Sequence, residues 1–187
     1  MFIHIRRMLF AAGLAVLLNS CAVYGYRPGT CPLADEHLAD IPRGKGTVSV
    51  INVTESKTVR FNPCLLDPPP TYTDLKHWGE DICYELKNAL KRLGYTVSDS
   101  GEKLIQIRVT RTSMHVRMFY YTQIVLFEIE LGDENKIDMK VVKRAQSLTP
   151  GIHERYGPVM DAAYWILRNE TVQEYLREGQ VGEVSYK

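Results

Sequence analysis

The stretch "DLKHWGEDICYELKNALKRL", residues 74–93, constrains the fold most strongly. Its apolar residues recur at spacings of three and four, which puts them on one face of a helix: Leu75, Trp78, Ile82, Leu86, Ala89, Leu90 and Leu93. Thr73 or Asp74 can cap the start of this helix, and Gly94 can close its end in the left-handed conformation. The segment is therefore predicted to be an amphipathic helix that packs on another layer of the protein.

Four other segments show the alternation of apolar and polar residues that is typical of half-buried strands. They are residues 47–55, 102–118, 120–131 and 136–148. The last two are joined by a four-residue polar connection that contains Gly132, which indicates a hairpin. A second helix is predicted over residues 157–176, with Pro158 in its first turn. The order β-α-β-β-β-α predicts an α+β fold, a small antiparallel-rich sheet with two helices packed on one face.

Residues 56–73 contain four prolines and follow no steady pattern. Long loops of this kind inside a small domain are often functional. We interpret the segment as a solvent-exposed loop, stiffened by polyproline in its proline-rich part at residues 63–70, in preference to a binding loop.

The N-terminus has the layout of an export signal. Arg6 and Arg7 precede eleven apolar or glycine residues, 8–18, which as a helix would span only about 16 Å of a hydrocarbon layer about 30 Å thick. The sequence Leu-Asn-Ser-Cys follows, and it resembles a bacterial lipobox. The resemblance implies cleavage between Ser20 and Cys21 and acylation of Cys21, and several acyl chains, palmitate among them, give stable attachment to a membrane.

The lipobox resemblance also implies a location and a domain organisation. Ala22 follows the cysteine, which by the sorting rule of enteric bacteria favours the outer membrane, with the chain facing the periplasm. Residues 1–20 are then the signal peptide and 21–45 a lipidated flexible tether, because residues 22–45 hold three prolines, three glycines and no sustained period. Residues 46–178 form one domain, and 179–187 a loose tail.

Charge and cysteine content narrow the function further. Without Arg6 and Arg7, 21 of the 23 basic residues remain against 22 acidic ones, so no nucleic-acid partner is indicated. The other cysteines, Cys31, Cys64 and Cys83, are compatible with one disulfide and one thiol or with three free thiols. Cys83 falls on the apolar face of the first helix, which favours a small buried hydrophobe.

The whole chain after the signal segment resembles the YajG-like family of bacterial lipoproteins. The features that carry the resemblance are the lipobox, a first strand near "TVSVINV", a helix that ends in "LKRLGYTV", a strand "LIQIRV", a hairpin, and a last helix that ends in an acidic turn before "VQEYL". The resemblance implies a location and a fold rather than an activity. The additional cysteines and the "DPPP" loop depart from the family pattern between the first strand and the first helix.

No motif in the sequence supports catalysis. His77, Glu80 and Asp81 share one helix, but a zinc site needs three or four converging ligands, so they are interpreted as a solvated face with favourable charge pairs. His37, His115 and His153 are isolated. The sequence contains no nucleophile elbow, no zinc-protease motif and no phosphate-binding loop. We therefore expect no catalytic residues, no metal and no cofactor.

The consecutive aromatic residues Phe119, Tyr120 and Tyr121 are the first candidate for a binding surface, because exposed aromatic turns are unusual unless something binds there. Aromatic residues are equally common in cores and strands, so packing in the core or across strands is favoured for these three and for the other aromatics. The others include Tyr72, Trp78, Tyr84, Tyr164 and Trp165. The sequence thus predicts a non-enzymatic accessory or structural lipoprotein that binds an envelope protein or peptidoglycan. The alternative is an auxiliary lipoprotein of lipid or lipopolysaccharide transport or assembly, which a deep apolar cleft would favour.

Overall fold

The structure is a computed structural model, and it describes residues 28–60, 72–117, 120–132, 135–145 and 152–178. The fold is built on one mixed sheet of five strands, in the order β4-β1-β5-β6-β7. Strand β1 runs parallel to β4 and β5, whereas β5, β6 and β7 form an antiparallel meander. The strands are β1 (Thr47–Asn52), β4 (Thr96–Val97), β5 (Lys103–Arg117), β6 (Tyr120–Leu131) and β7 (Asn135–Ala145).

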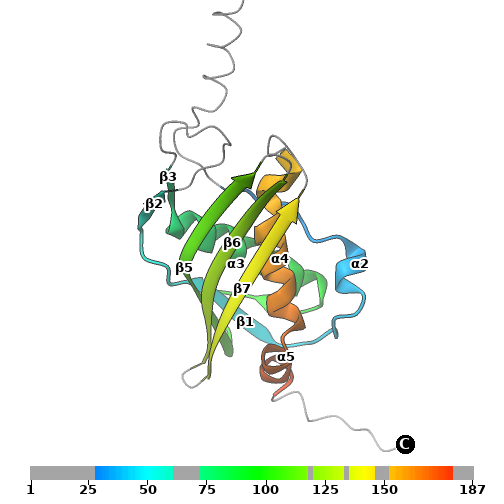
Figure 1. The fold of residues 1–187 in the computed structure, drawn as a ribbon. Helices are drawn as coiled ribbons and strands as arrows, with labels where there is room; N and C mark the ends of the chain where they lie inside the picture. Colours follow the sequence, from blue (N-terminus) through cyan, green and yellow to red (C-terminus); the bar gives the residue numbers. More distant parts are fainter. Residues whose placement is uncertain (1–27, 61–71, 118–119, 133–134, 146–151, 179–187) are drawn as a thin grey trace, which may run out of the picture.

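Two long helices, α3 (Leu75–Arg92) and α4 (Ile152–Arg168), pack against the sheet and against each other. Figure 1 shows β5, β6 and β7 side by side in front of α3 and α4. Helix α3 contacts β1 and β5, whereas α4 contacts β6 and β7. The predicted α+β class is therefore confirmed. The Asp74 side chain caps α3 by accepting a hydrogen bond of 2.9 Å from the backbone N–H of Lys76, and Gly94 follows its end with a φ of +100°.

The core lies between the helices and the sheet. All seven residues of the predicted apolar face of α3 are buried in it, and Cys83 is buried beside them. On the sheet side, Ile105, Ile107 and Val109 of β5 are buried, whereas Arg108 and Thr110 between and after them are exposed on the opposite face. This alternation is the reason that one face of the sheet is apolar and covered by helices while the other is polar.

The N-terminal part of the described chain departs from the expected flexible tether. It forms a short helix, α2 (Asp35–Leu38), and Leu33, Leu38 and Ile41 belong to the core cluster. Arg92 of α3 donates a hydrogen bond to the carbonyl of Leu33 and forms an ion pair with Asp35. The prediction of a tether over 21–45 is therefore wrong for residues 28–45, because apolar burial attaches them to the domain. Residues 21–27 lie outside the described part.

Three further differences concern short elements. The segment predicted as one second helix forms two helices. Helix α4 begins at Ile152, five residues before the predicted start at Gly157, and ends at Arg168. Helix α5 (Glu170–Arg177) follows after Asn169, whose side chain caps it by accepting a hydrogen bond from Val172 N–H. Pro158 therefore lies inside α4 and not in its first turn. The predicted loop 56–73 contains two paired strands, β2 (Thr58–Arg60) and β3 (Tyr72–Asp74), and its residues 61–71 lie outside the described part.

Candidate functional site

A groove with a volume of about 390 Å³ lies between the edge strand β7, helix α4 and the segment that contains α2. We call it the α4–β7 groove. Its lining comes from residues far apart in the sequence, namely Val142, Lys143 and Arg144 of β7, Met160, Asp161, Tyr164 and Trp165 of α4, and Leu33 and His37 near α2. The groove is within the size range of ligand sites in proteins and has both apolar and charged walls.

The groove runs along the edge of the sheet. Successive side chains of a strand point to opposite faces, so three consecutive lining residues can border one groove only if it lies beside the strand. Accordingly Lys143 lies on the helix-covered face, with buried Val141, whereas Val142 and Arg144 are exposed on the other face. Strand β7 ends the sheet on this side, so the groove occupies the place where a further strand would lie.

Aromatic rings form the wall on α4. The ring of Tyr164 makes edge-to-face contacts with His37 and Trp165, with centroid separations of 5.5 Å and 5.4 Å. Arg168 holds the same tyrosine by donating a hydrogen bond of 2.7 Å to its hydroxyl oxygen. Trp165 nevertheless keeps 50% of its surface exposed. The wall is therefore both fixed in position and open to a ligand.

The charged groups of the groove are mostly basic. Lys143 Nζ lies 3.0 Å from a carboxylate oxygen of Asp161 across the groove. The Lys143 stem passes over Gly157 of α4, where a Cβ atom would come within 3.2 Å of the Lys143 Cε. Arg144 lies over the ring of Tyr120, 5.4 Å from its centroid, and it has no acidic partner among the described residues. An acidic group of a ligand would find a free cation at Arg144.

The predicted aromatic surface adjoins this groove at one residue. Tyr120 is half-buried and lies under Arg144. Tyr121 pairs through its backbone with Val116 and Ala145, while its side chain and the whole of Phe119 lie outside the described part, as do Ser20 and Cys21. The sequence points to Tyr120 but not to the groove, because Tyr164 and Trp165 are expected to pack in the core or across strands.

Helix α3 carries buried carboxyl groups and no metal cluster. The described residues contain no group of three or more His, Cys, Asp or Glu that could hold a metal ion. Asp81 is buried, so the prediction of a solvated face is wrong at this position. Glu85 one turn later is buried too, and neither of its carboxylate oxygens accepts a hydrogen bond. Burial, together with the charge of Asp81, raises the pKa of Glu85, and Arg92 opposes that shift.

The cysteines of the described part are free thiols, Cys31 and Cys83. Burial raises the pKa of Cys83 to about 12, so its thiol stays protonated and is a poor nucleophile. The interpretation of Cys83 as a small buried hydrophobe is confirmed. Cys64 lies outside the described part.

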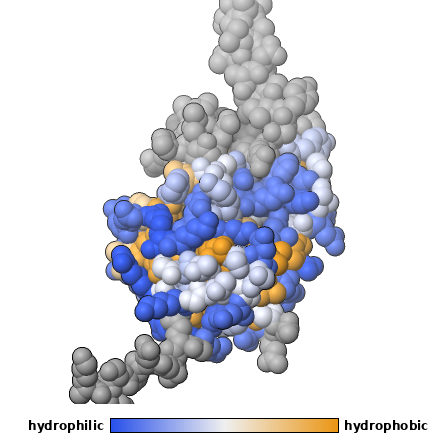
Figure 2. All heavy atoms as spheres, turned by 180° about the vertical axis from the view of Figure 1, so that it is seen from behind, coloured by the Kyte–Doolittle hydropathy of each residue, from blue (hydrophilic) through white to orange (hydrophobic). Residues whose placement is uncertain are grey.

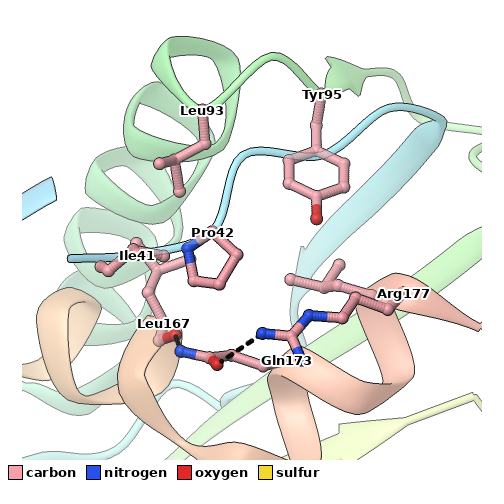
Figure 3. Close-up of a pocket in the computed structure, with 8 residues that line it drawn as sticks. Ile41, Pro42, Leu93, Tyr95, Leu167, Gln173 and Arg177 are labelled. Atoms are coloured by element: carbon pink, nitrogen blue, oxygen red, sulfur yellow. Dashed lines mark hydrogen bonds between the residues drawn. The ribbon is translucent and has the colours of Figure 1, made fainter. Parts of the chain in front are cut away.

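Away from the groove, the largest core side chains of the described part, among them Trp78 and Phe127, are fully buried. A cavity of about 10 Å³ between α3, α4 and α5 can hold at most about one water (Figure 3). Gln173 closes it by donating to the carbonyl of Leu167 at 3.0 Å and accepting from Arg177 at 3.1 Å. The open face of the sheet carries charges of both signs, with Lys136 Nζ 2.9 Å from Glu128 and 3.7 Å from Glu130. The described residues thus combine a buried apolar core with a polar sheet face.

Seen from behind, the described part has a largely hydrophilic surface, with hydrophobic colour in small separate areas (Figure 2). None of the helices in the described ranges has the length and apolar character needed to cross a bilayer.

Comparisons with known proteins do not assign a family. No family model matches the sequence, and a search of curated proteins gives no match. Among solved structures, the chain is similar to protein XCC0632 from Xanthomonas campestris, which belongs to the family DUF330. The two sequences are 13% identical, and the match covers 83% of this chain and 96% of that chain with a TM-score of 0.49. A protein described as uncharacterised is 11% identical over 81% and 97% of the two chains, with a TM-score of 0.36.

A further solved structure is described as a homolog of a neuraminyllactose-binding hemagglutinin from Helicobacter pylori. It is 12% identical, with coverage of 73% of this chain and 90% of that chain and a TM-score of 0.39. Similarity at this level carries no argument about function. The site defines this chain only as an α+β domain with a groove at the edge of its sheet.

Proposed function

We propose that this chain is a non-enzymatic binding lipoprotein of the bacterial outer membrane, anchored through Cys21 on the periplasmic side, that holds an envelope partner in the α4–β7 groove. The lipobox-like end of the signal segment and the resemblance to YajG-like lipoproteins support the anchor and the location. The half-exposed Trp165, held in an aromatic wall beside a free sheet edge, supports the binding role. A near-neutral charge gives no support to a nucleic-acid partner.

The role of an auxiliary lipoprotein in lipid or lipopolysaccharide transport is less well supported. Such a role needs space for acyl chains in an apolar interior. The cavity between the helices holds about 10 Å³ in the described part of the chain, and the larger α4–β7 groove is lined by charged as well as apolar residues. A partner with polar groups, such as an envelope protein or peptidoglycan, suits that lining better.

The anchor is tested with the full chain in a Gram-negative host. Cys21→Ala should accumulate as an unprocessed precursor that incorporates no labelled palmitate, because the sulfur that carries the lipid is removed. Cys31→Ala is the matched control and should be processed and labelled like the unchanged protein. A Cys21→Ala product of mature size that still incorporates palmitate would refute the anchor.

The binding role is tested by affinity purification of the lipidated protein from the same host. Trp165→Ala should remove at least one enriched protein or glycan, because it removes the most exposed ring of the groove. Tyr84→Ala is the control, since Tyr84 on α3 is 56% exposed and lies outside the groove. Co-purified material that is identical for both variants and the unchanged protein would count against the groove as the binding site.

A further inference from the structure

The identity of the ligand can be narrowed by the position of the groove, and this step rests on the proposed function. We propose that the occupant is an extended acidic segment of a partner polypeptide, which pairs with β7 through its main chain as a sixth strand of the sheet. Recognition of this type joins main-chain hydrogen bonds at a sheet edge with pockets for alternate side chains.

Strand β7 forms an edge of the sheet in the described part of the chain. On its inner side β7 pairs with β6 over its whole length, from Asn135 to Ala145. On its outer side no other described strand pairs with it, so a row of backbone donors and acceptors is available. The groove follows this edge over Val142, Lys143 and Arg144, which is about 10 Å at about 3.3 Å per residue. Three or four residues of an extended chain fit that length.

The charges on β7 are mostly positive. Strand β7 carries four basic residues, Lys136, Lys140, Lys143 and Arg144, and one acidic residue, Asp138. Lys136 is neutralised by Glu128 and Glu130, and Lys143 by Asp161. Lys140 and Arg144 have no acidic partner among the described residues. Opposite charges across a strand pair are favourable, so an acidic strand complements this edge.

The same charges disfavour a second copy of this chain as the occupant. In a pair of β7 strands placed edge to edge, both strands would carry more basic than acidic side chains. Like charges directly opposite each other destabilise a strand pair, so such a dimer is disfavoured. Exposed lysines on edge strands commonly serve to prevent this kind of self-association. The edge is thus selective, because it repels its own copy and attracts an acidic segment.

The aromatic wall on α4 faces the position of the added strand. A strand added to β7 alternates its side chains between the two faces of the sheet, so every second one would point toward α4. There it meets Tyr164 and Trp165, which provide apolar contact on rings that are already fixed by neighbouring contacts. The hydroxyl oxygen of Tyr164 already accepts a hydrogen bond from Arg168, so this wall offers a ligand mainly apolar contact with its rings. That chemistry suits an apolar or aromatic side chain in alternation with acidic ones.

The first experiment identifies the segment in cells. A photo-reactive benzoylphenylalanine is placed at Val142 in the groove or, as control, at Ile51 of β1, which is 41% exposed and outside the groove. The full lipidated chain is irradiated, and the cross-linked peptides are identified by mass spectrometry. The proposal expects a partner peptide that contains Asp or Glu and is cross-linked at Val142 but not at Ile51.

The second experiment tests the main-chain pairing with the identified peptide in synthetic form. The protein has two tryptophans, and Trp78 is fully buried, so a change of fluorescence on titration reports on Trp165. Two forms of the peptide are made, one methylated on the backbone nitrogens of its odd-numbered residues and one on those of its even-numbered residues. Methylation of the nitrogens that face β7 should weaken binding at least tenfold, and methylation of the other set should leave binding unchanged. Arg144→Glu should weaken binding at least tenfold, and a peptide with Lys in place of its acidic residues should recover affinity for that variant.

The outcomes separate this inference from the proposed function. If the peptide binds but tolerates methylation in both registers, or if the cross-link is to a second copy of this chain, strand addition is refuted and a binding role remains. If purified muropeptides, and no peptide, change the Trp165 fluorescence, the polypeptide occupant is refuted and the binding role again remains. If neither probe changes it and Val142 cross-links no more than Ile51, both proposals fail.

Discussion

The two tryptophans of the chain show how differently its two long helices use the same sheet. Trp78 on α3 is fully buried, and its indole N–H donates a hydrogen bond of 3.0 Å to the Thr73 hydroxyl oxygen. Trp165 on α4 is half-exposed and touches Tyr164 edge to face. Both helices cover the same face of the sheet, but α3 packs on β1 and β5, which have strands on either side, whereas α4 packs on β6 and β7, where the sheet ends.

The burial of these two indole rings depends on how far the sheet extends beneath each helix. Over β1 and β5 the sheet presents a continuous apolar face, and every apolar residue of α3 that faces it is buried. At β7 the sheet ends, and the side of α4 that extends beyond β7 faces a groove. A strand added at this edge would extend the apolar face of the sheet and cover Trp165, in the same way as the domain covers Trp78.

The largest expected effect is on the α3 side. Leu86→Asp places a carboxylate in the fully buried interior and leaves it without a partner. We expect a loss of about 5 kcal/mol or more, which is comparable to the whole stability of a domain, so the variant should not fold. Tyr84→Asp on the exposed face of α3 is the matched control and should melt within a few degrees of the unchanged protein. Circular dichroism and thermal melting measure both, and a folded Leu86→Asp variant would mean that α3 does not pack as described.

The next effect tests the buried tryptophan itself. Trp78→Ala removes a fully buried indole and leaves its space empty, which should cost about 3–5 kcal/mol in the free energy of unfolding. Thr73→Val leaves the indole N–H of Trp78 without its present acceptor and should cost less, about 1–3 kcal/mol. Urea unfolding followed by circular dichroism measures both values. Equal costs for Trp78→Ala and for Trp165→Ala would contradict the contrast between the two helices.

The features that sequence reasoning located share a regular period. The apolar face of α3 has seven members at helical spacing, and the meander β5-β6-β7 alternates over more than ten residues per strand, so each pattern outweighs local exceptions. The features it missed are short or depend on distant partners. Leu33, Leu38 and Ile41 follow no period within a segment rich in turn-forming residues, and they are buried only because α3 and its neighbours lie nearby.

The groove could not be read from the sequence for the same reason. Its walls come from residues near position 35, from β7 and from α4, and nothing local to any of them shows that they meet. The local cluster at Tyr120 is next to the groove only because Arg144 of the neighbouring strand reaches over its ring. Likewise, the helical spacing that placed Leu86 in the core gave no sign that Glu85 beside it is buried as well.

A smaller effect, opposite in sign, is expected at Glu85. Its pKa is raised in the folded protein by burial, so the folded state binds the proton more tightly than the unfolded state does. The contribution of Glu85 to stability is therefore fully present below the unfolded pKa of about 4.3 and is lost as the pH rises through the folded pKa. At neutral pH, Glu85→Gln should therefore stabilise the domain and raise its Tm, because the amide carries no charge that burial disfavours.

The gain from Glu85→Gln should shrink as the pH falls toward 4, because both forms are then neutral. Glu174→Gln on the exposed face of α5 is the control and should change Tm little at any pH. Calorimetric melting between pH 4 and pH 8 measures the two profiles. A Glu85→Gln variant that is less stable than the unchanged protein at pH 7 would show that the carboxylate is stabilised by contacts that outweigh its burial.

The smallest destabilisation is expected at Trp165, and it completes the comparison of the two helices. Because half of this side chain is already exposed, Trp165→Ala removes one edge-to-face contact and part of the buried area, and it should cost about 1 kcal/mol in the free energy of unfolding, several-fold below the cost at Trp78. The same substitution should abolish the fluorescence response to the peptide cross-linked at Val142 and, measured calorimetrically, weaken its binding about tenfold or more, since aromatic residues in such grooves carry much of the binding energy. If Trp165→Ala instead destabilised the fold as much as Trp78→Ala while leaving peptide affinity unchanged, the residue would be part of the core, and the sheet edge would have no aromatic wall to offer a partner.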